Sequence, residues 1–333
     1  MVCVHLAGWI GSKSKQRMRT SPLHLPHLTL CCVDNQYPTL GFEAVQKTCA
    51  QLSFAEVLFF TRPDFVLPAH EIQNLTVVTS EVIRNIEDYS RFMLKGLRAY
   101  VKSSHVLIIQ WDGFVIRPQA WQDQFLQYDY IGAPWPKKTG PWVGNGGFSL
   151  RSTKLLTALQ DETIKPMHPE DVCICDEHRS YLEDVRHIQF APPELADAFS
   201  FEFGKPHANA FGFHGMSNFP VVMPASELVQ FIEIMPDALI FNGYFRLFVL
   251  NVVKLKSPEL RLALEAKVSA VRFTLDAARI TSDAFHDLIK TFVKARCLRL
   301  AWQFLRLRVA HQGWRQRNVQ LAARVFFAFF YLK

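Results

Sequence analysis

Four short apolar runs alternate with segments of helical spacing in the first third of the chain, and this alternation restricts the possible folds more than any other feature. The runs are residues 28–33, 56–60, 75–78 and 106–111. Apolar residues recur at helical spacing in between, at 40–52 and 89–101. Strands that alternate with helices in this way are typical of a mostly parallel sheet with helices on both faces. We therefore expect an α/β, Rossmann-like fold.

The pattern changes near residue 226, after which the chain reads as one helix after another. Segments 260–279 and 284–309 place Arg and Lys among regularly spaced Leu, Val and Phe. We expect an irregular leader at 1–27, an α/β domain at 28–225 and a basic amphipathic helical region at 226–333.

The charge is divided unevenly between these parts. Residues 240–333 contain 17 Lys and Arg against 5 Asp and Glu, which leaves 20 basic and 25 acidic residues for the remainder. A basic segment of this kind indicates an anionic partner. An anionic membrane surface suits helices that mix basic and aromatic residues. Nucleic acid is disfavoured because no nucleic-acid-binding motif accompanies the charge. Packing on the first domain with a solvated basic face is the alternative.

The amino-terminal residues 1–10 are apolar, but basic residues follow them rather than precede them, so we expect no signal peptide. No uncharged apolar run reaches the ~18 residues needed to span a bilayer. We expect a cytoplasmic protein, with peripheral attachment to the inner face of the cytoplasmic membrane as an option.

The fourth apolar run ends in Gln110-Trp111-Asp112-Gly113. A carboxylate at the end of a central strand lies at the sheet edge where open α/β folds bind ligands. Asp112 is therefore a candidate ligand for a divalent metal or a ribose. The alternative is a plain turn, since Asp-Gly is a common turn signal.

A glycine cluster follows about thirty residues later, at Gly144-Asn145-Gly146-Gly147. Glycine backbone allows close approach because it carries no Cβ. The spacing matches neither a P-loop nor a dinucleotide-binding motif. We expect a loop that faces a ligand, with a tight turn as the alternative.

Three further positions are candidates for chemistry. Glu170 and Asp171 are adjacent carboxylates at an expected helix start, where an acid serves either as a general base or as a helix cap. His214 lies between glycines in a loop and, with carboxylates, suits Mn²⁺ or a similar ion, although a lone His is more often structural. Trp135 would stack on a sugar or a base, or would anchor its loop in the core.

Taken together, these segments resemble the GT-A glycosyltransferases, and most closely an uncharacterised bacterial family in that superfamily with galactosyltransferase-like motifs. The resemblance runs from about residue 28 to 218. It is carried by five motifs in one order: QWDGF, YDYIGAPW, VGNGGFSLRS, HPEDV and FGFHG.

This resemblance implies a hexosyltransferase that uses a nucleotide-diphospho-sugar donor, most commonly a UDP-sugar, and a divalent ion, Mn²⁺ or Mg²⁺. GT-A enzymes usually carry an Asp-x-Asp motif at the end of a central strand. The matching positions are Gln110-Trp111-Asp112, where an amide replaces the first acid. Asp112 and His214 are thus the implied metal ligands.

The resemblance also assigns roles in binding and catalysis. Asp171 would be the base of an inverting transfer, with Glu170 as the alternate. The implied donor-binding residues are Asn35, Tyr37, Gln110, Trp111, Asp112, Trp135, Asn145, Gly146 and Gly147. The expected acceptor is a hydroxyl of a cell-surface glycan or of a lipid-linked glycan.

Two other functions are compatible with the same residues. A glycoside or phosphoester hydrolase would use Asp112 together with Asp171. A non-catalytic binding protein would have lost its metal site through Gln110, and its basic helices would carry the function.

Overall fold

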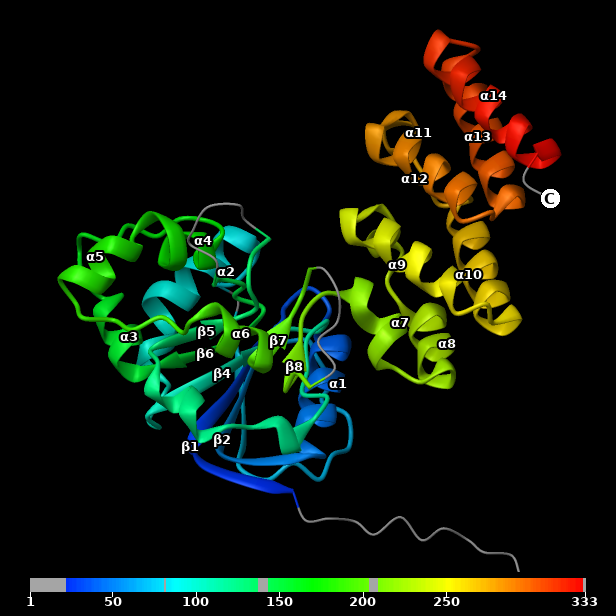
Figure 1. Ribbon diagram of the computed structural model, residues 1–333. Helices are drawn as coiled ribbons and strands as arrows, with labels where there is room; N and C mark the ends of the chain where they lie inside the picture. The colour runs from blue at the N-terminus through cyan, green and yellow to red at the C-terminus, as the bar shows by residue number, and fades with distance from the viewer. Residues whose placement is uncertain (1–21, 81, 137–142, 204–208, 332–333) are drawn as a thin grey trace, which may run out of the picture.

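A six-stranded sheet forms the centre of the amino-terminal part (Figure 1). The computed structural model describes residues 22–80, 82–136, 143–203 and 209–331. The strand order is β3-β2-β1-β4-β6-β5. The strands are β1 Leu23–Val33, β2 Leu52–Thr61, β3 Leu75–Thr79, β4 His105–Ile109, β5 Tyr130–Gly132 and β6 Phe148–Ser152. The first four are mutually parallel, whereas β6 is antiparallel to β4 and to β5. The expected mostly parallel sheet is confirmed.

β1 begins at Leu23, inside the segment 1–27 that we expected to be irregular, so that expectation is wrong for residues 23–27. Residues 1–21 of this segment lie outside the described part. Pro26 and two histidines obscure the strand in the sequence. Between Leu23 and Leu25 the strand pairs only with β2, because its pairing with β4 starts at Leu28. A proline, which lacks an N–H, is tolerated where a strand has one free edge and an irregular register.

The central strands of the sheet are buried on both faces, whereas the edge strand β3 is largely exposed. Leu30, Leu107 and Ile109 point into one core, which α1 (Pro38–Cys49) covers. Val106 and Ile108 point into the other, together with α2 (Ile86–Arg91), α3 (Thr153–Ala158) and α5 (Arg179–Asp184). Strands buried on both faces are apolar throughout rather than alternating, which is why short apolar runs mark them in the sequence.

One expected element takes a different form. The helix expected at 89–101 is α2 followed by a π-helical turn, Phe92–Gly96, and a 3₁₀ turn, Leu97–Ala99. After α6 (Pro193–Phe199) the chain forms a small parallel pair of strands, β7 (Ser200–Phe201) and β8 (Gly212–Phe213). A further short helix, α4 (Glu170–Val172), lies between α3 and α5.

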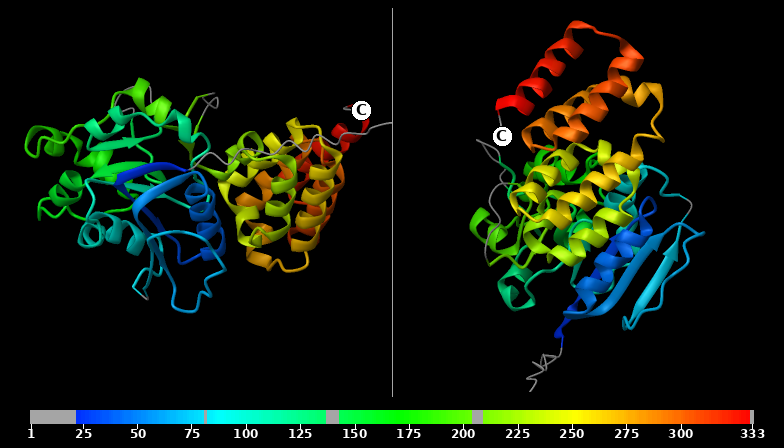
Figure 2. Two further views of the ribbon diagram at one scale, coloured as in Figure 1. Left: turned by 90° about the horizontal axis from the view of Figure 1, so that it is seen from below. Right: turned by 90° about the vertical axis from the view of Figure 1, so that its right-hand side faces the viewer.

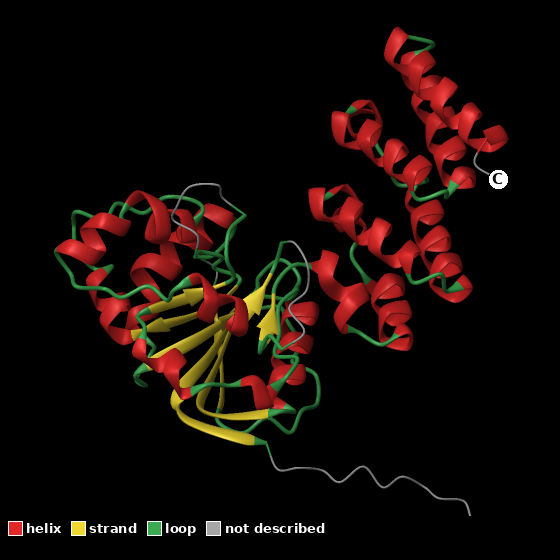
Figure 3. Ribbon diagram, in the orientation of Figure 1, coloured by secondary structure: helices red, strands yellow, loops and turns green. Residues whose placement is uncertain are grey.

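The remainder of the described chain is helical, and Figure 3 shows its helices extending away from the sheet. They are α7 Phe219–Val222, α8 Ala225–Ile234, α9 Gly243–Lys254, α10 Pro258–Val271, α11 Ala277–Thr281, α12 Asp283–Lys294, α13 Leu298–Gln312 and α14 Gln316–Tyr331. Side-chain caps begin several of them, since Ser257, Asp276 and Ser282 each accept a hydrogen bond from a backbone N–H in the first turn. The expected carboxy-terminal helical region is confirmed.

One hydrophobic core joins the two regions. The core under α1 continues through Phe219, Phe231 and Phe248 into the helices and reaches Val325. Figure 1 and Figure 2 show α7, α8 and α9 next to the sheet region and α13 and α14 at the far end. Among the described residues, no helix has the length and hydropathy required to cross a membrane.

Candidate functional site

The strand order reverses between β1 and β4, so a ligand-binding crevice is expected at the carboxyl ends of these two strands. From β1 the chain proceeds to β2 and β3 on one side, whereas β4, β6 and β5 lie on the other. Ligands of open α/β sheets bind where the strand order reverses in this way. Asp34 and Asn35 follow β1 at this point, and Gln110 to Asp112 follow β4.

His214 is the centre of a polar cluster at this crevice. Its Nε2 lies 3.2 Å from Asp112 Oδ1 and 3.1 Å from Gln110 Oε1, and its Nδ1 lies 3.1 Å from Glu202 Oε1. β8 places His214, because the residue directly follows that strand. The structure thus brings together the Asp112 and His214 that were expected to form one site.

The electrostatic environment of His214 is dominated by its two carboxylate neighbours. Burial opposes protonation of the imidazole, but the negative charges of Asp112 and Glu202 and the hydrogen bonds to them raise the pKa of His214 well above its usual range. Asp112 Oδ2 accepts a hydrogen bond from Met216 N at 3.1 Å. Both oxygens of Asp112 are therefore engaged within the protein.

Asn145 holds this cluster in place. Its backbone is in the left-handed region, with φ of 57°. Its Nδ2 donates to Glu202 Oε2 at 2.6 Å and lies 3.0 Å from His214 Nδ1, and its Oδ1 accepts from Phe148 N at 3.2 Å. Because the Asn145 side chain is buried and makes these contacts, it fixes the positions of Glu202 and of the Nδ1 side of the His214 ring.

The glycine cluster is close-packed against the protein itself. A Cβ at Gly147 would lie 2.1 Å from His214 Nε2, and one at Gly146 would lie 2.2 Å from Glu170 Oε1. A Cβ at Gly144 would lie 2.0 Å from the Trp135 ring. The bare backbone that we expected to face a ligand is therefore covered at these points by His214, Glu170 and Trp135.

Glu170 and Asp171 have different surroundings, although they are adjacent. Glu170 is buried and accepts a hydrogen bond from Arg151 Nη2 at 3.0 Å, and Arg151 is itself fully buried. Burial raises the pKa of Glu170, while the charge of Arg151 counteracts this increase. The alternate role of Glu170 as the base therefore disagrees with the structure, because Arg151 engages its carboxylate in the core.

Asp171 is half-buried, and its side chain lies beside the glycine cluster. Its Oδ2 accepts from Gly146 N at 3.1 Å and its Oδ1 from Val172 N at 2.9 Å. A carboxylate oxygen can accept a second hydrogen bond, so this group can still receive one from a ligand hydroxyl.

Asn35 and Tyr37 lie on the β1 side of the crevice. Asn35 Nδ2 donates to Ser80 O at 3.0 Å and to Ile83 O at 2.6 Å, while its Oδ1 is buried without a hydrogen-bond partner among the described residues. The Tyr37 ring meets the Trp111 ring edge-on, with centroids 6.0 Å apart.

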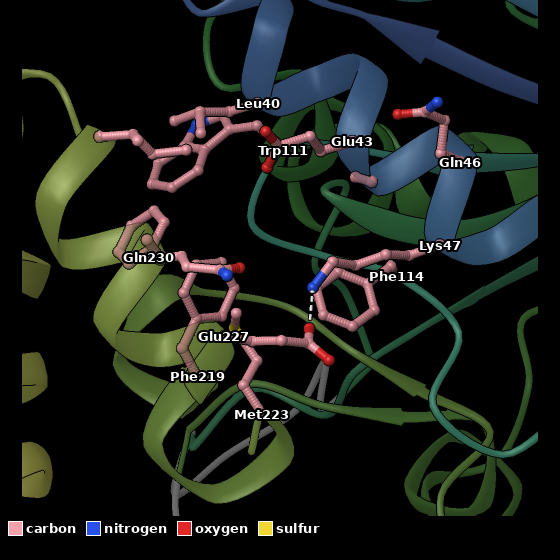
Figure 4. Close-up of a pocket in the computed structure, with 13 residues that line it drawn as sticks. Leu40, Glu43, Gln46, Lys47, Trp111, Phe114, Phe219, Met223, Glu227 and Gln230 are labelled. Carbon is pink, nitrogen blue, oxygen red and sulfur yellow. Dashed lines mark hydrogen bonds and ion pairs between the residues drawn. The ribbon is translucent and has the colours of Figure 1, made fainter. Parts of the chain in front are cut away.

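Trp111 and Trp135 both pack against apolar surfaces. The Trp135 ring covers Gly144 and lies against the second core, which matches its alternative role as an anchor. Trp111 stacks on Phe231 with centroids 6.3 Å apart and lines a cavity of about 290 Å³ between α1 and α8 (Figure 4). This cavity does not include the His214 cluster.

Three residues of the site were not among the expected ones. Asp34 directly follows β1 and Glu202 directly follows β7. Tyr244 projects from α9, and burial raises the pKa of its hydroxyl, as do the negative charges of Glu202, Asp112 and Asp171. An acid after an apolar run was a usable signal for Asp34, as it was for Asp112. No sequence signal pointed to Tyr244.

A divalent ion is compatible with the donor atoms in the cluster. Within the part of the chain that the structure describes, no three His, Cys, Asp or Glu side chains are grouped to hold a metal ion. The three candidate metal-ligating atoms are Asp112 Oδ1, His214 Nε2 and the amide oxygen Gln110 Oε1, because both oxygens face His214 Nε2. Glu202 at Nδ1 supplies the carboxylate that commonly orients a ligating histidine.

Comparison with known proteins identifies one family model and several distant structures. The model is described as a protein of unknown function (DUF5672) and matches residues 72–214, less than half of the chain. No curated protein matches the sequence.

Two solved structures are similar at low identity. One is the mannosyltransferase PcManGT from Pyrobaculum calidifontis in complex with GDP-Man and Mn²⁺, at 12% identity and a TM-score of 0.35, covering 92% of this chain and 87% of that one. The other is a glycosyltransferase involved in the glycosylation of the major capsid of PBCV-1, at 12% identity and a TM-score of 0.31, covering 57% of this chain and 94% of that one. At these TM-scores, neither structure defines the fold or the activity of this chain.

Proposed function

We propose that this chain is a glycosyltransferase of the GT-A type, which transfers a sugar from a nucleotide-diphospho-sugar to an acceptor hydroxyl. One observation carries the proposal. Asp112, Glu202 and His214, from three separate segments, converge at the point where the strand order of the sheet reverses. A site at such a point takes nucleotide ligands in open α/β sheets.

The proposed reaction is a direct displacement at the anomeric carbon. The acceptor oxygen forms a bond to this carbon, the bond to the diphosphate oxygen breaks, and Asp171 takes the proton of the acceptor hydroxyl. Hydrogen bonds from Gly146 N and Val172 N fix the orientation of the Asp171 carboxylate. With one base and no nucleophile, the anomeric configuration is inverted, so a product with retained configuration would contradict this role of Asp171.

Asp112, His214 and the amide oxygen of Gln110 are the proposed holders of a divalent ion, Mn²⁺ or Mg²⁺. Such an ion, when bound, neutralises charge on a leaving diphosphate. Glu202 and Asn145 keep His214 oriented through its Nδ1 side. Asn35 and Tyr37, at the end of β1, are the proposed contacts for the nucleoside.

The donor is proposed to be a UDP-hexose, and the acceptor a cell-surface glycan or a lipid-linked glycan. GDP-sugars are the second choice for the donor. A competing candidate is a non-catalytic nucleotide-sugar-binding protein. It is favoured by the arrangement of His214, which links Asp112 and Glu202 into a self-contained ion-paired unit.

The proposal is tested by calorimetric titration of UDP-, GDP- and dTDP-sugars, with and without Mn²⁺. We expect one nucleotide class to bind to the wild type in a metal-dependent manner and to lose this binding in Asp112→Asn. Asp64→Asn is the matched control, because Asp64 is exposed and pairs only with Arg62 among the described residues. Absence of binding to every nucleotide sugar would exclude a glycosyltransferase.

A second variant separates catalysis from binding. Asp171→Asn should bind the donor as the wild type does but should lower kcat by about a hundredfold or more, because it cannot accept the proton. Donor binding without transfer to any acceptor in the wild type would select the non-catalytic alternative.

A further inference from the structure

The last helix, α14, has two apolar faces. One consists of Leu321, Val325 and Ala328, which are buried against the neighbouring helices. The other points outward and consists of Val319, Ala323, Phe326 and Phe330. Their spacing of four, three and four residues places them in one stripe along a helix. A surface helix needs only the first of these faces to pack in its own fold.

The outward stripe is exposed to an unusual degree for large side chains. Phe326 is 61% exposed and Phe330 is 62% exposed, and their rings touch each other with centroids 4.7 Å apart. Trp314, just before the helix, is 65% exposed. Aromatic residues gathered on an exposed face mark a site of interaction with a partner or a membrane. Figures 1 and 2 show that α14 lies at the end of the molecule away from the sheet.

The sequence segment that contains this stripe carries basic residues and no acidic ones, although Arg317 of α14 pairs with Asp283 of the neighbouring α12. Residues 288–333 contain ten Lys and Arg and no Asp or Glu. Six of the basic residues are exposed and form no ion pair with a described residue: Lys294, Arg296, Arg299, Arg306, Arg315 and Arg324. Arg308, by contrast, is buried and donates to Ile280 O and Ser282 O, so its role is structural.

We propose that α13 and α14 form a docking surface for an anionic lipid membrane. Phe326, Phe330 and Trp314 would enter the boundary between headgroups and acyl chains, where aromatic side chains are favoured. The exposed arginines would lie at the level of the lipid phosphates, to which a basic surface is attracted. This inference does not depend on the proposed transferase activity.

The charge argues against a second copy of the chain as the occupant of this surface. Pairing through the outward stripes would bring two acid-free, strongly basic segments together, and like charges across an interface oppose association. A nucleic acid would match the charge but would leave the aliphatic and phenyl groups of the stripe in water. An anionic membrane satisfies both features at once.

The test is flotation of the full chain with vesicles of phosphatidylcholine, and with vesicles that contain about one third phosphatidylglycerol. We expect binding to the anionic vesicles only, and we expect it to weaken as salt is added. The double variant Phe326→Ser/Phe330→Ser should reduce this binding about tenfold or more. Phe273→Ser is the matched control, since Phe273 is 78% exposed but lies outside the acid-free segment.

Sedimentation of the free protein supplies the second readout. The wild type and the double variant should both be monomeric and equally stable, because the substituted side chains are exposed. Absence of binding to anionic vesicles would overturn the proposal, as would equal binding by the double variant. Dimerisation that the double variant abolishes, without vesicle binding, would assign the stripe to a second copy instead.

Discussion

At the scale of single residues, the crevice concentrates buried negative charge. Asp34 and Asp112 follow neighbouring strands, and the charge of Asp112 contributes to the environment of Asp34. Two backbone N–H groups, those of Gln36 and Tyr37, donate to Asp34 Oδ1 at 3.0 Å and 2.6 Å. Burial nevertheless raises the pKa of Asp34 from 3.8 to about 6. Ionisation of Asp34 therefore lowers the free energy of unfolding of the protein.

This pKa shift predicts how Asp34 affects stability as the pH changes. Between about pH 4 and pH 6 the folded protein binds the proton that the unfolded chain has lost, so its free energy of unfolding falls as the pH rises. Above pH 6 the cost is fully present. Asp34→Asn keeps the acceptor oxygen without the charge and should raise the free energy of unfolding by about 3 kcal/mol at pH 7.5.

Urea unfolding followed by tryptophan fluorescence at several pH values measures this effect. The gain from Asp34→Asn should disappear below about pH 4, where Asp34 is protonated in both states. The exposed Asp64 offers the comparison, because Asp64→Asn should change stability little at any pH. If Asp34→Asn were less stable than the wild type at pH 7.5, the ionised carboxylate would stabilise the fold rather than destabilise it, contrary to this prediction.

At the scale of elements, the loop 144–147 and the β8 strand determine each other's position. The loop can pass His214 only because residue 147 has no side chain. Gly113 has a similar constraint, since a Cβ there would lie 2.9 Å from Phe213 O. These close approaches hold the ends of β4, β6 and β8 together at the crevice.

Substitution of Gly147 by Ala should therefore displace His214. The added methyl group cannot be accommodated without a shift of the imidazole, so we expect a loss of about 1–3 kcal/mol in stability and a loss of nucleotide-sugar binding. Gly243→Ala is the matched control, because Gly243 begins α9 and a Cβ there would meet nothing within 4 Å. Chemical unfolding and calorimetric titration of both variants distinguish them. Normal ligand binding by Gly147→Ala would show that the position of His214 is not needed.

At the scale of the whole molecule, aromatic packing joins the helices to the sheet region. Phe231 of α8 is buried against Trp111 and Phe219, and its ring lies 5.8 Å from that of Phe248 on α9. An ion pair between Lys47 of α1 and Glu227 of α8 lines the adjacent cavity (Figure 4). The apolar contacts exclude water, whereas the side chain of Glu227 is 45% exposed.

The two kinds of contact should differ in their contribution to stability. Phe231→Ala removes a buried ring and should lower the free energy of unfolding by about 3–5 kcal/mol. Glu227→Gln breaks a partly exposed ion pair and should change it by less than about 1 kcal/mol. Urea denaturation of the two variants measures both values. A larger loss from Glu227→Gln than from Phe231→Ala would mean that charge, rather than packing, joins the two regions.

Much of the fold could be predicted from the sequence because the central strands are buried on both faces and appear as continuous apolar runs. The short strand β5 could not, since three residues between prolines and aromatics leave no periodic signal. Asp112 and His214 could be predicted as one site. Glu202 could not, because its partnership with His214 depends on the pairing of β7 with β8, two strands of two residues each.

The sequence by itself determined the mostly parallel α/β sheet, the helical region after it and the acid at the end of β4. Each of these follows from the hydrophobic periodicity of a short segment and from the order of the segments along the chain. Only the tertiary structure decided what surrounds each polar group. It placed Glu170 in a buried ion pair with Arg151 but left Asp171 only half-buried, although the two are adjacent. It also filled the space beside the glycines with the protein's own side chains. Burial and charge pairing depend on segments far apart in the chain, and no local pattern records which of them meet.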